Sequence, residues 1–268
     1  MTPAAILITA GAVGAAAFAT GLTGYGFGLV AMGILPYVMS VAEANALVVP
    51  LAFVLTIVAL IPLRRELTVR LLWPVALGAL AGVPIGVVYL IRLDEGVLRL
   101  SLGVIIFIAL AGSIFGGIRE RRRAAMAGGG GSDAAERSAV PRSGRGRIAA
   151  RRIGAVGVGL VSGAFGGAFS VSGPPVVLYL SEILPGKRRL KAHLLAYFNF
   201  VISIRLILLS ASGVITAEVL KTAVWMLPAL GIGVFAGTIL HNRLPTQIVR
   251  VIIQGLLAIS ALLLIVAA

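Results

Sequence analysis

Long apolar runs separated by short polar breaks dominate the chain. Runs of ordinary membrane-spanning length lie at about 43–63, 69–91, 97–117, 192–212, 218–240 and 247–267. An α-helix rises about 1.5 Å per residue, so roughly 20 apolar residues cross the hydrocarbon core of a bilayer. The pattern therefore predicts an all-α polytopic membrane protein with six ordinary spans.

Two further apolar runs, at about 4–36 and 152–186, are too long for one simple span, and glycine interrupts both. The first contains the glycine-rich stretch 20–28, and the second contains the stretch 162–175, which ends in Gly173, Pro174 and Pro175. Proline lacks the backbone N–H and clashes with the preceding turn, so a helix must end before this motif. Each long run is expected to break and fold back as a helical hairpin.

Composition narrows the class of protein further. Apolar residues make up 59% of the chain and charged residues 12%, whereas a soluble domain has about 25% charged residues. A water-soluble enzyme is therefore excluded. The chain has no cysteine and two histidines, so neither a disulfide, a metal site nor a cofactor is expected. The first basic residue is Arg64, so the N-terminus does not resemble a cleavable signal, which begins with a basic region.

The net charge of +14 is concentrated in the breaks between apolar runs. Residues 118–151, rich in arginine, glycine and serine, predict a flexible linker between an N-terminal repeat, 1–117, and a C-terminal repeat, 152–268. Cytoplasmic loops of membrane proteins have an excess of Lys and Arg. The linker is thus expected on the cytoplasmic side of a bacterial inner membrane. A nucleic-acid role for its arginines is the alternative, and it is disfavoured.

The two halves resemble each other at the level of small residues and arginines. At an offset of 142, Gly21, Gly24 and Phe27 match Gly163, Gly166 and Phe169. At an offset of 151, a second set of pairs matches, namely Gly82 with Gly233, Gly86 with Gly237, Arg92 with Arg243, and Arg99 with Arg250. The shared glycine breaks and the paired arginines favour an internal duplication.

Loop charges determine the relative orientation of the two repeats. The net charge is +2 for 64–70, +7 for 118–152, +4 for 187–191 and +2 for 241–250. If all eight runs crossed once, the loop 187–191 would lie opposite the linker, against the positive-inside rule. If both long runs fold back instead, every basic loop is cytoplasmic and each half crosses the membrane three times. The halves are then inverted repeats, a pattern typical of secondary transporters whose substrate site lies between the two breaks.

The doubled glycine-rich segment, the central basic linker and the repeated Gly82–Gly86 and Gly233–Gly237 motifs resemble the TauE/SafE sulfite exporter family, also called the toluene-sulfonate uptake permease family. The resemblance covers the chain apart from the linker. It implies a bacterial inner-membrane carrier of sulfur-containing anions, either sulfite or organosulfonates such as sulfoacetate and isethionate. The residues by themselves imply only that the substrate is an anion.

Arg205 has the only charge well inside an apolar run. Intramembrane ionisable residues are costly and usually face a cavity, and a guanidinium binds a sulfonate in a bidentate manner. Snorkelling to the outer interface, with Gly213 about 12 Å further along the helix, and a structural contact remain the alternatives. Asn199 lies about 120° around the same helix from Arg205, so it belongs either to the site or to a contact between helices.

The two breaks complete the predicted substrate site. Their backbone N–H groups at half-helix starts, with the hydroxyls of tyrosine and serine, are expected to bind the anion. The alternative role of these glycines is close helix packing, which we accept for Gly82, Gly86, Gly233 and Gly237. The predicted residues are Gly24, Tyr25 and Gly26 in the first break and Gly166, Gly167, Ser170, Ser172 and Gly173 in the second.

The other polar residues suggest less. Glu43, Glu182, His193 and His241 lie near the ends of apolar runs, where a solvated interface is the expected environment. A serine hydrolase that pairs Ser172 with one of the histidines is a disfavoured alternative, and a small-anion channel is a second one. The expected partners are the anion and membrane lipid, not nucleic acid, and a homodimer stays open.

Overall fold

The computed structural model describes residues 3–23, 26–108, 145–184 and 186–241, and these residues form helices joined by short turns. Residues 95–108 are helical up to the end of the described stretch. The other elements in chain order are α1 Pro3–Thr23, α2 Phe27–Ile34, η1 Leu35–Tyr37, α3 Val41–Leu60, η2 Ile61–Glu66, α4 Val69–Arg92, α7 Arg145–Phe169, α8 Gly173–Ile183, α9 Lys187–Ala211 and α10 Ala217–His241.

Four helices in the described part are long and apolar enough to cross a membrane, namely Val41–Glu66, Val69–Arg92, Arg188–Ala211 and Ala217–Leu240. They confirm the spans predicted at 43–63, 69–91, 192–212 and 218–240. Residues 95–108 begin the span predicted at 97–117, while the rest of that span and the one at 247–267 lie outside the described residues. Large apolar side chains such as Trp73, Trp225 and Phe235 are exposed on the outer surface, as lipid contact requires. The chain is a multi-pass membrane protein.

Both long apolar runs are broken, as predicted. The first run forms α1 and the short α2, and the second forms α7 and α8, with α8 beginning directly at the Gly173-Pro174-Pro175 motif. Proline is tolerated in the first turn of a helix, where its missing N–H costs nothing. Helix α7 begins at Arg145, inside the range 118–151 predicted for the linker, and the division of the chain into two repeats and a linker stays a prediction.

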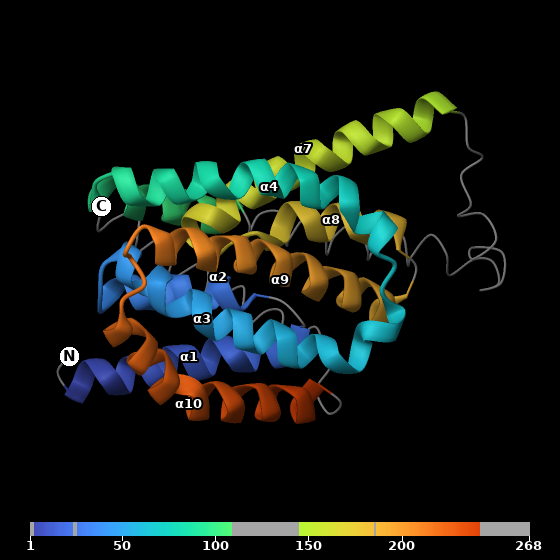
Figure 1. The fold of residues 1–268 in the computed structure, drawn as a ribbon. Helices are drawn as coiled ribbons and strands as arrows, with labels where there is room; N and C mark the ends of the chain where they lie inside the picture. The colour runs from blue at the N-terminus through green and yellow to red at the C-terminus, as the bar shows by residue number, and fades with distance from the viewer. Residues whose placement is uncertain (1–2, 24–25, 109–144, 185, 242–268) are drawn as a thin grey trace.

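Two closely packed helix pairs form opposite sides of the molecule, with α2, α3, α8 and α9 between them (Figure 1). One pair is α4 with α7 and the other is α1 with α10. A methyl group on Gly82 would overlap the carbonyl oxygen of Leu160, and one on Gly233 would overlap that of Gly14. Glycine at these positions lets the two backbones touch, so the packing role predicted for the four-residue-spaced glycines is confirmed.

Equivalent contacts recur in the two pairs with constant shifts in residue number. Gly86 faces Ala164 in one pair, and Gly237 faces Phe18 in the other. Adding 151 to a residue number in α4 gives its counterpart in α10, and adding 146 to a residue number in α1 gives its counterpart in α7. The offset of 142 predicted for the first segments is therefore wrong by one helical turn. Glycine recurs at every turn of α7 from Gly154 onward, so sequence matching alone does not distinguish the two registers.

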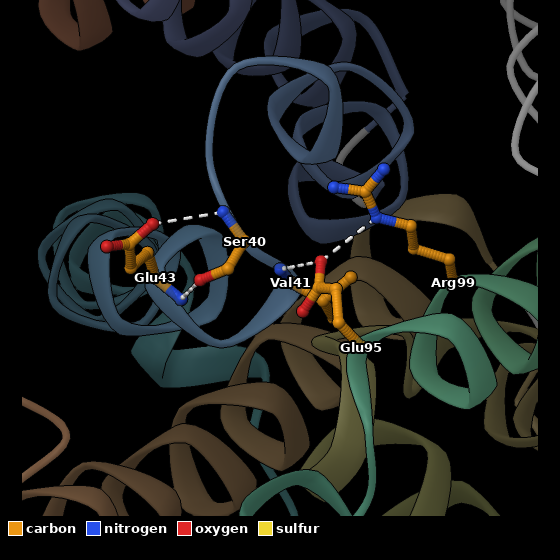
Figure 2. A network of polar contacts seen from close by, with 5 residues as sticks. All are labelled: Ser40, Val41, Glu43, Glu95 and Arg99. Carbon is orange, nitrogen blue, oxygen red and sulfur yellow. Dashed lines mark hydrogen bonds and ion pairs between the residues drawn. The ribbon is translucent and has the colours of Figure 1, made fainter. Parts of the chain in front are cut away.

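At one end of the molecule, a polar network joins the start of α3 to the helix 95–108 (Figure 2). Ser40 and Glu43 form a capping box, in which each side chain bonds the other's backbone N–H. Glu95 accepts hydrogen bonds from the Val41 N–H at 2.9 Å and from Arg99 Nε at 3.0 Å. The network satisfies N–H groups that a helix start leaves unpaired. Glu43 is exposed there, as expected for a residue at a segment end.

At the other end, the start of α9 contacts the junction between η2 and α4. Arg188 lies 3.6 Å from Glu66 in an ion pair, which brings the basic loops 64–70 and 187–191 together. The single-crossing alternative does not allow this contact. His193 is fully buried here, so its predicted solvated environment is wrong. Its Nε2 accepts the Thr68 N–H at 3.1 Å, and its Nδ1 donates to the Arg189 carbonyl at 2.8 Å.

Candidate functional site

The two helix breaks meet in the middle of the molecule. A methyl group on Gly28, in the first turn of α2, would overlap the backbone of Ser170, the first residue after α7. Gly26 has φ of 102° and Ser170 has φ of 60°. Only glycine adopts the first value without strain, and serine adopts the second at a cost of about 1 kcal/mol. Both breaks therefore have backbone conformations that a continuing helix does not permit.

A cavity of about 60 Å³ lies between the breaks and the helices α3 and α9. One water needs about 10–15 Å³ on this scale, so the cavity has room for a few waters or one small oxyanion. Of the described residues that line it, Arg205 alone has a charged side chain. The lining residues are Thr20, Gly26, Phe27, Gly28, Leu29, Val49, Ala52, Leu55, Thr56, Gly166, Ser170, Val171, Ser172, Gly173, Leu195, Phe198, Val201, Ile202 and Arg205.

Arg205 is 1% exposed and lies at this cavity, so it does not snorkel to the outer interface. One terminal nitrogen of its guanidinium donates to Ser170 Oγ, and the other donates to Asn45 Oδ1. Its Nε is buried and has no hydrogen-bond partner among the described residues. A guanidinium has five N–H donors, so donors remain for a ligand in the cavity.

Asn45, on α3, is a site residue that the sequence analysis missed. Its Oδ1 accepts from Arg205 and from Ser170 Oγ, the latter at 3.2 Å, and its Nδ2 donates to the Ala168 carbonyl at 2.9 Å. The side chain is fully buried. A polar amide inside the apolar run 43–63 is the sequence signal, because buried polar groups in a membrane need partners. Asn45 thus fixes the second break and Arg205 together.

Asn199 is not part of this cluster. Its Nδ2 donates to Thr56 Oγ1 at 3.2 Å and so connects α9 to α3. The rotation of about 120° between Asn199 and Arg205 directs the two side chains to different partners. Of the two roles left open for Asn199, the structure shows the contact between helices, although Thr56 itself lines the cavity.

The predicted residues of the two breaks divide into two groups. Gly26, Gly166, Ser170, Ser172 and Gly173 line the cavity. In contrast, Gly167 packs against the backbone of Val83 and Gly86 in the α4–α7 pair and is not among the described residues that line the cavity. Gly24 and Tyr25 lie outside the described residues.

The starts of α2 and α8 differ in the donors that they offer. At α2, whose N-cap is Gly26, no side chain of the described residues caps the helix, and its first N–H groups have no partner within the helix. At α8, Pro174 and Pro175 lack N–H groups, which leaves Gly173 as the main donor of that turn. The carbonyl of Ser172 accepts from Ser162 Oγ. Backbone binding of an anion is therefore expected chiefly from α2.

The pairing of Ser172 with His193 that a serine hydrolase requires is not formed. Both ring nitrogens of His193 are bonded to backbone groups at the far end of α9, and its Nε2 accepts from an N–H. The side chain of His241 lies outside the described residues. No group of three or more His, Asp or Glu side chains that could hold a metal occurs in the described ranges.

The chain matches the family model described as "Sulfite exporter TauE/SafE" over residues 8–264. No curated protein and no solved structure matches it. The matched range contains both helix breaks, the cavity between them and the four described spans. The protein therefore belongs to the TauE/SafE sulfite exporter family of membrane transporters.

Proposed function

We propose that this protein is a secondary transporter of a small sulfur-containing anion, and that Arg205 binds the anion between the two helix breaks. The observation that supports this most directly is the chemistry of the cavity. Its described lining has one buried cation and no carboxylate. A charge inside a membrane protein is costly unless it is compensated, and an oxyanion compensates a guanidinium in a favourable planar geometry.

The substrate is either sulfite or a small organosulfonate such as isethionate or sulfoacetate. The cavity volume of about 60 Å³ favours the smallest of these. Ser170, Ser172 and the N–H groups at the start of α2 supply further donors to the oxygens. The apolar remainder of the lining suits the carbon atoms of an organosulfonate.

The proposed mechanism is alternating access between two inverted repeats. The helix pairs α4–α7 and α1–α10 make equivalent contacts, and each pair contains one helix from each half of the chain. Figure 1 shows the two pairs running in opposite directions. Movement of one pair relative to the other would open the central cavity first to one side of the membrane and then to the other. We place the basic loops and the linker 118–151 in the cytoplasm, with the chain in a bacterial inner membrane.

The experiment that tests this function measures sulfite binding and transport by the purified full chain in proteoliposomes. The chain has no cysteine, so sulfite meets no thiol or disulfide. Arg205→Gln should weaken sulfite binding by about tenfold or more, as expected for loss of a buried charged partner. Arg92→Gln is the matched control, because Arg92 is exposed at the end of α4. Sulfite affinity unchanged in Arg205→Gln would refute the assigned site.

A small-anion channel is the alternative function, and the same proteoliposomes distinguish it. A carrier saturates with substrate and accelerates the uptake of labelled sulfite when unlabelled sulfite is present inside. A channel does neither. Ser170 and Arg205 line the cavity and are hydrogen-bonded to each other and to Asn45 of α3. This connection between the second break, α3 and α9 favours the carrier.

A further inference from the structure

The partner of the buried arginine is a neutral amide and not a carboxylate. Asn45 Oδ1 accepts from Arg205 and from Ser170, while its Nδ2 donates to the Ala168 carbonyl. The donor to Ala168 fixes which end of the amide faces Arg205, because a carbonyl oxygen can only accept. Asn45 thus orients the guanidinium without neutralising it. The described part of the site keeps a net charge of +1.

The groups that face Arg205 from the neighbouring elements do not change this charge. Asn45 comes from α3 and Ser170 from the break between α7 and α8. Thr20 of α1, Thr56 of α3 and Ser172 are the other polar side chains in the described cavity lining. Each of these side chains is an amide or an aliphatic hydroxyl, so none of them titrates at physiological pH.

A site with one positive charge treats singly and doubly charged anions differently. The attraction between the ligand and Arg205 grows in proportion to the charge of the ligand. The cost of removing the ligand from water grows with the square of that charge in a continuum description. A second negative charge therefore doubles the attraction but quadruples the desolvation cost. It also leaves one charge uncompensated inside the membrane protein.

From this balance we propose that the site selects its substrate by charge and takes a singly charged oxyanion, so that sulfite binds as hydrogensulfite. The proposal rests on the function proposed above and names the ionic form of its substrate. Hydrogensulfite and sulfite interconvert near neutral pH by loss of one proton to water. A transported hydrogensulfite thus carries its own proton, so the site needs no carboxylate to bind that proton during transport.

The test compares anions of similar shape and different charge on the purified full chain. Methanesulfonate and sulfate are both tetrahedral, but the first has one charge and the second has two. Isethionate and sulfoacetate form a second such pair. Binding is measured by calorimetry at constant ionic strength, maintained with gluconate. We expect methanesulfonate to bind at least about tenfold more tightly than sulfate, and isethionate more tightly than sulfoacetate.

The affinity for total sulfite should fall by about tenfold per pH unit above the hydrogensulfite transition, while methanesulfonate binding stays constant.

The possible results separate this proposal from the proposed function. Equal binding of sulfate and methanesulfonate would overturn charge selection and leave the anion site intact. Failure of all these anions and of sulfite to bind would overturn the proposed function itself.

Substitution of Asn45 provides a second test. Asn45→Asp adds a carboxylate beside Arg205, so we expect at least about tenfold weaker methanesulfonate binding. Asn45→Ser, which keeps a neutral acceptor, is the control and should retain a larger share of the affinity. Methanesulfonate binding by Asn45→Asp at the level of the Asn45→Ser control would contradict the proposal. If Asn45→Asp does not fold, the wild-type comparison of anions still decides.

Discussion

At the scale of single residues, Asn45 connects more of the site than any other described side chain. It bonds Arg205 of α9, Ser170 of the second break and the last turn of α7. Loss of a hydrogen bond to a charged group such as a guanidinium is more costly than loss of a hydrogen bond between neutral groups. The stability of the apo protein should therefore depend strongly on this one amide.

Replacement of the two buried asparagines by leucine tests this dependence. Asn45→Leu should destabilise the apo protein by about 1.5–3 kcal/mol, because it removes a neutral hydrogen-bond acceptor of a buried charge. Asn199→Leu is the matched control and removes one hydrogen bond to Thr56, so about 1 kcal/mol is expected. Thermal unfolding in detergent measures both. Equal losses in the two variants would contradict the role of Asn45.

Ligand binding gives a further prediction at the residue scale. An anion that binds only the folded protein raises its stability by about 2.7 kcal/mol at a concentration 100 times its Kd. We expect methanesulfonate to raise the melting temperature of the wild-type protein and not that of Arg205→Gln. An equal rise in both would place the anion away from Arg205.

At the scale of elements, the site depends on direct backbone contact between α2 and the end of α7. Gly28→Ala should reduce transport strongly and destabilise the protein by at least about 1–3 kcal/mol, because the new methyl group overlaps the Ser170 backbone. Gly11→Ala is the control, since beyond the backbone of its own helix no atom of the described residues lies within 4 Å of the position of its added Cβ. Transport by Gly28→Ala at the control level would show that the breaks separate easily.

The anchor of α9 on the η2–α4 junction is a second element-scale contact. His193→Phe removes the acceptor of the partly buried Thr68 N–H, and the loss of this hydrogen bond should cost about 0.5–1.5 kcal/mol. His193→Gln, whose amide oxygen is also an acceptor, should lose less. Hydrogen exchange of the Thr68 amide provides the local readout and should accelerate in His193→Phe. Unchanged exchange would show that water replaces the imidazole.

The sequence predicts elements well in this chain and contacts between them poorly. The four described spans, the two breaks and the interior position of Arg205 follow from hydropathy, from Gly173 with its two prolines, and from the cost of an intramembrane charge. The contacts of Asn45 and Gly167 cannot be predicted from the sequence in this way. Whether a small or polar side chain faces a cavity or a neighbouring helix depends on the rotation of each helix, and an almost uniformly apolar surface leaves that rotation undetermined.

At the scale of the whole molecule, the proposed topology places Arg189 in the cytoplasm and Ser212 outside. Both residues are exposed, and the chain has no cysteine, so single-cysteine variants can be labelled without background. A membrane-impermeant maleimide added to intact cells should label Ser212→Cys and leave Arg189→Cys unmodified. After the membrane is permeabilised, both should react. Labelling of Arg189→Cys from outside would rule out the two folded-back hairpins.

The pairing of α1 with α10 has a consequence for biosynthesis. Helix α1 contacts a helix that is made about two hundred residues after it. Until then α1 must wait in the bilayer with its glycine face, including Gly14 and Gly21, turned toward lipid. A chain truncated before α10 should therefore insert but not assemble, and quality-control proteases would be expected to remove it.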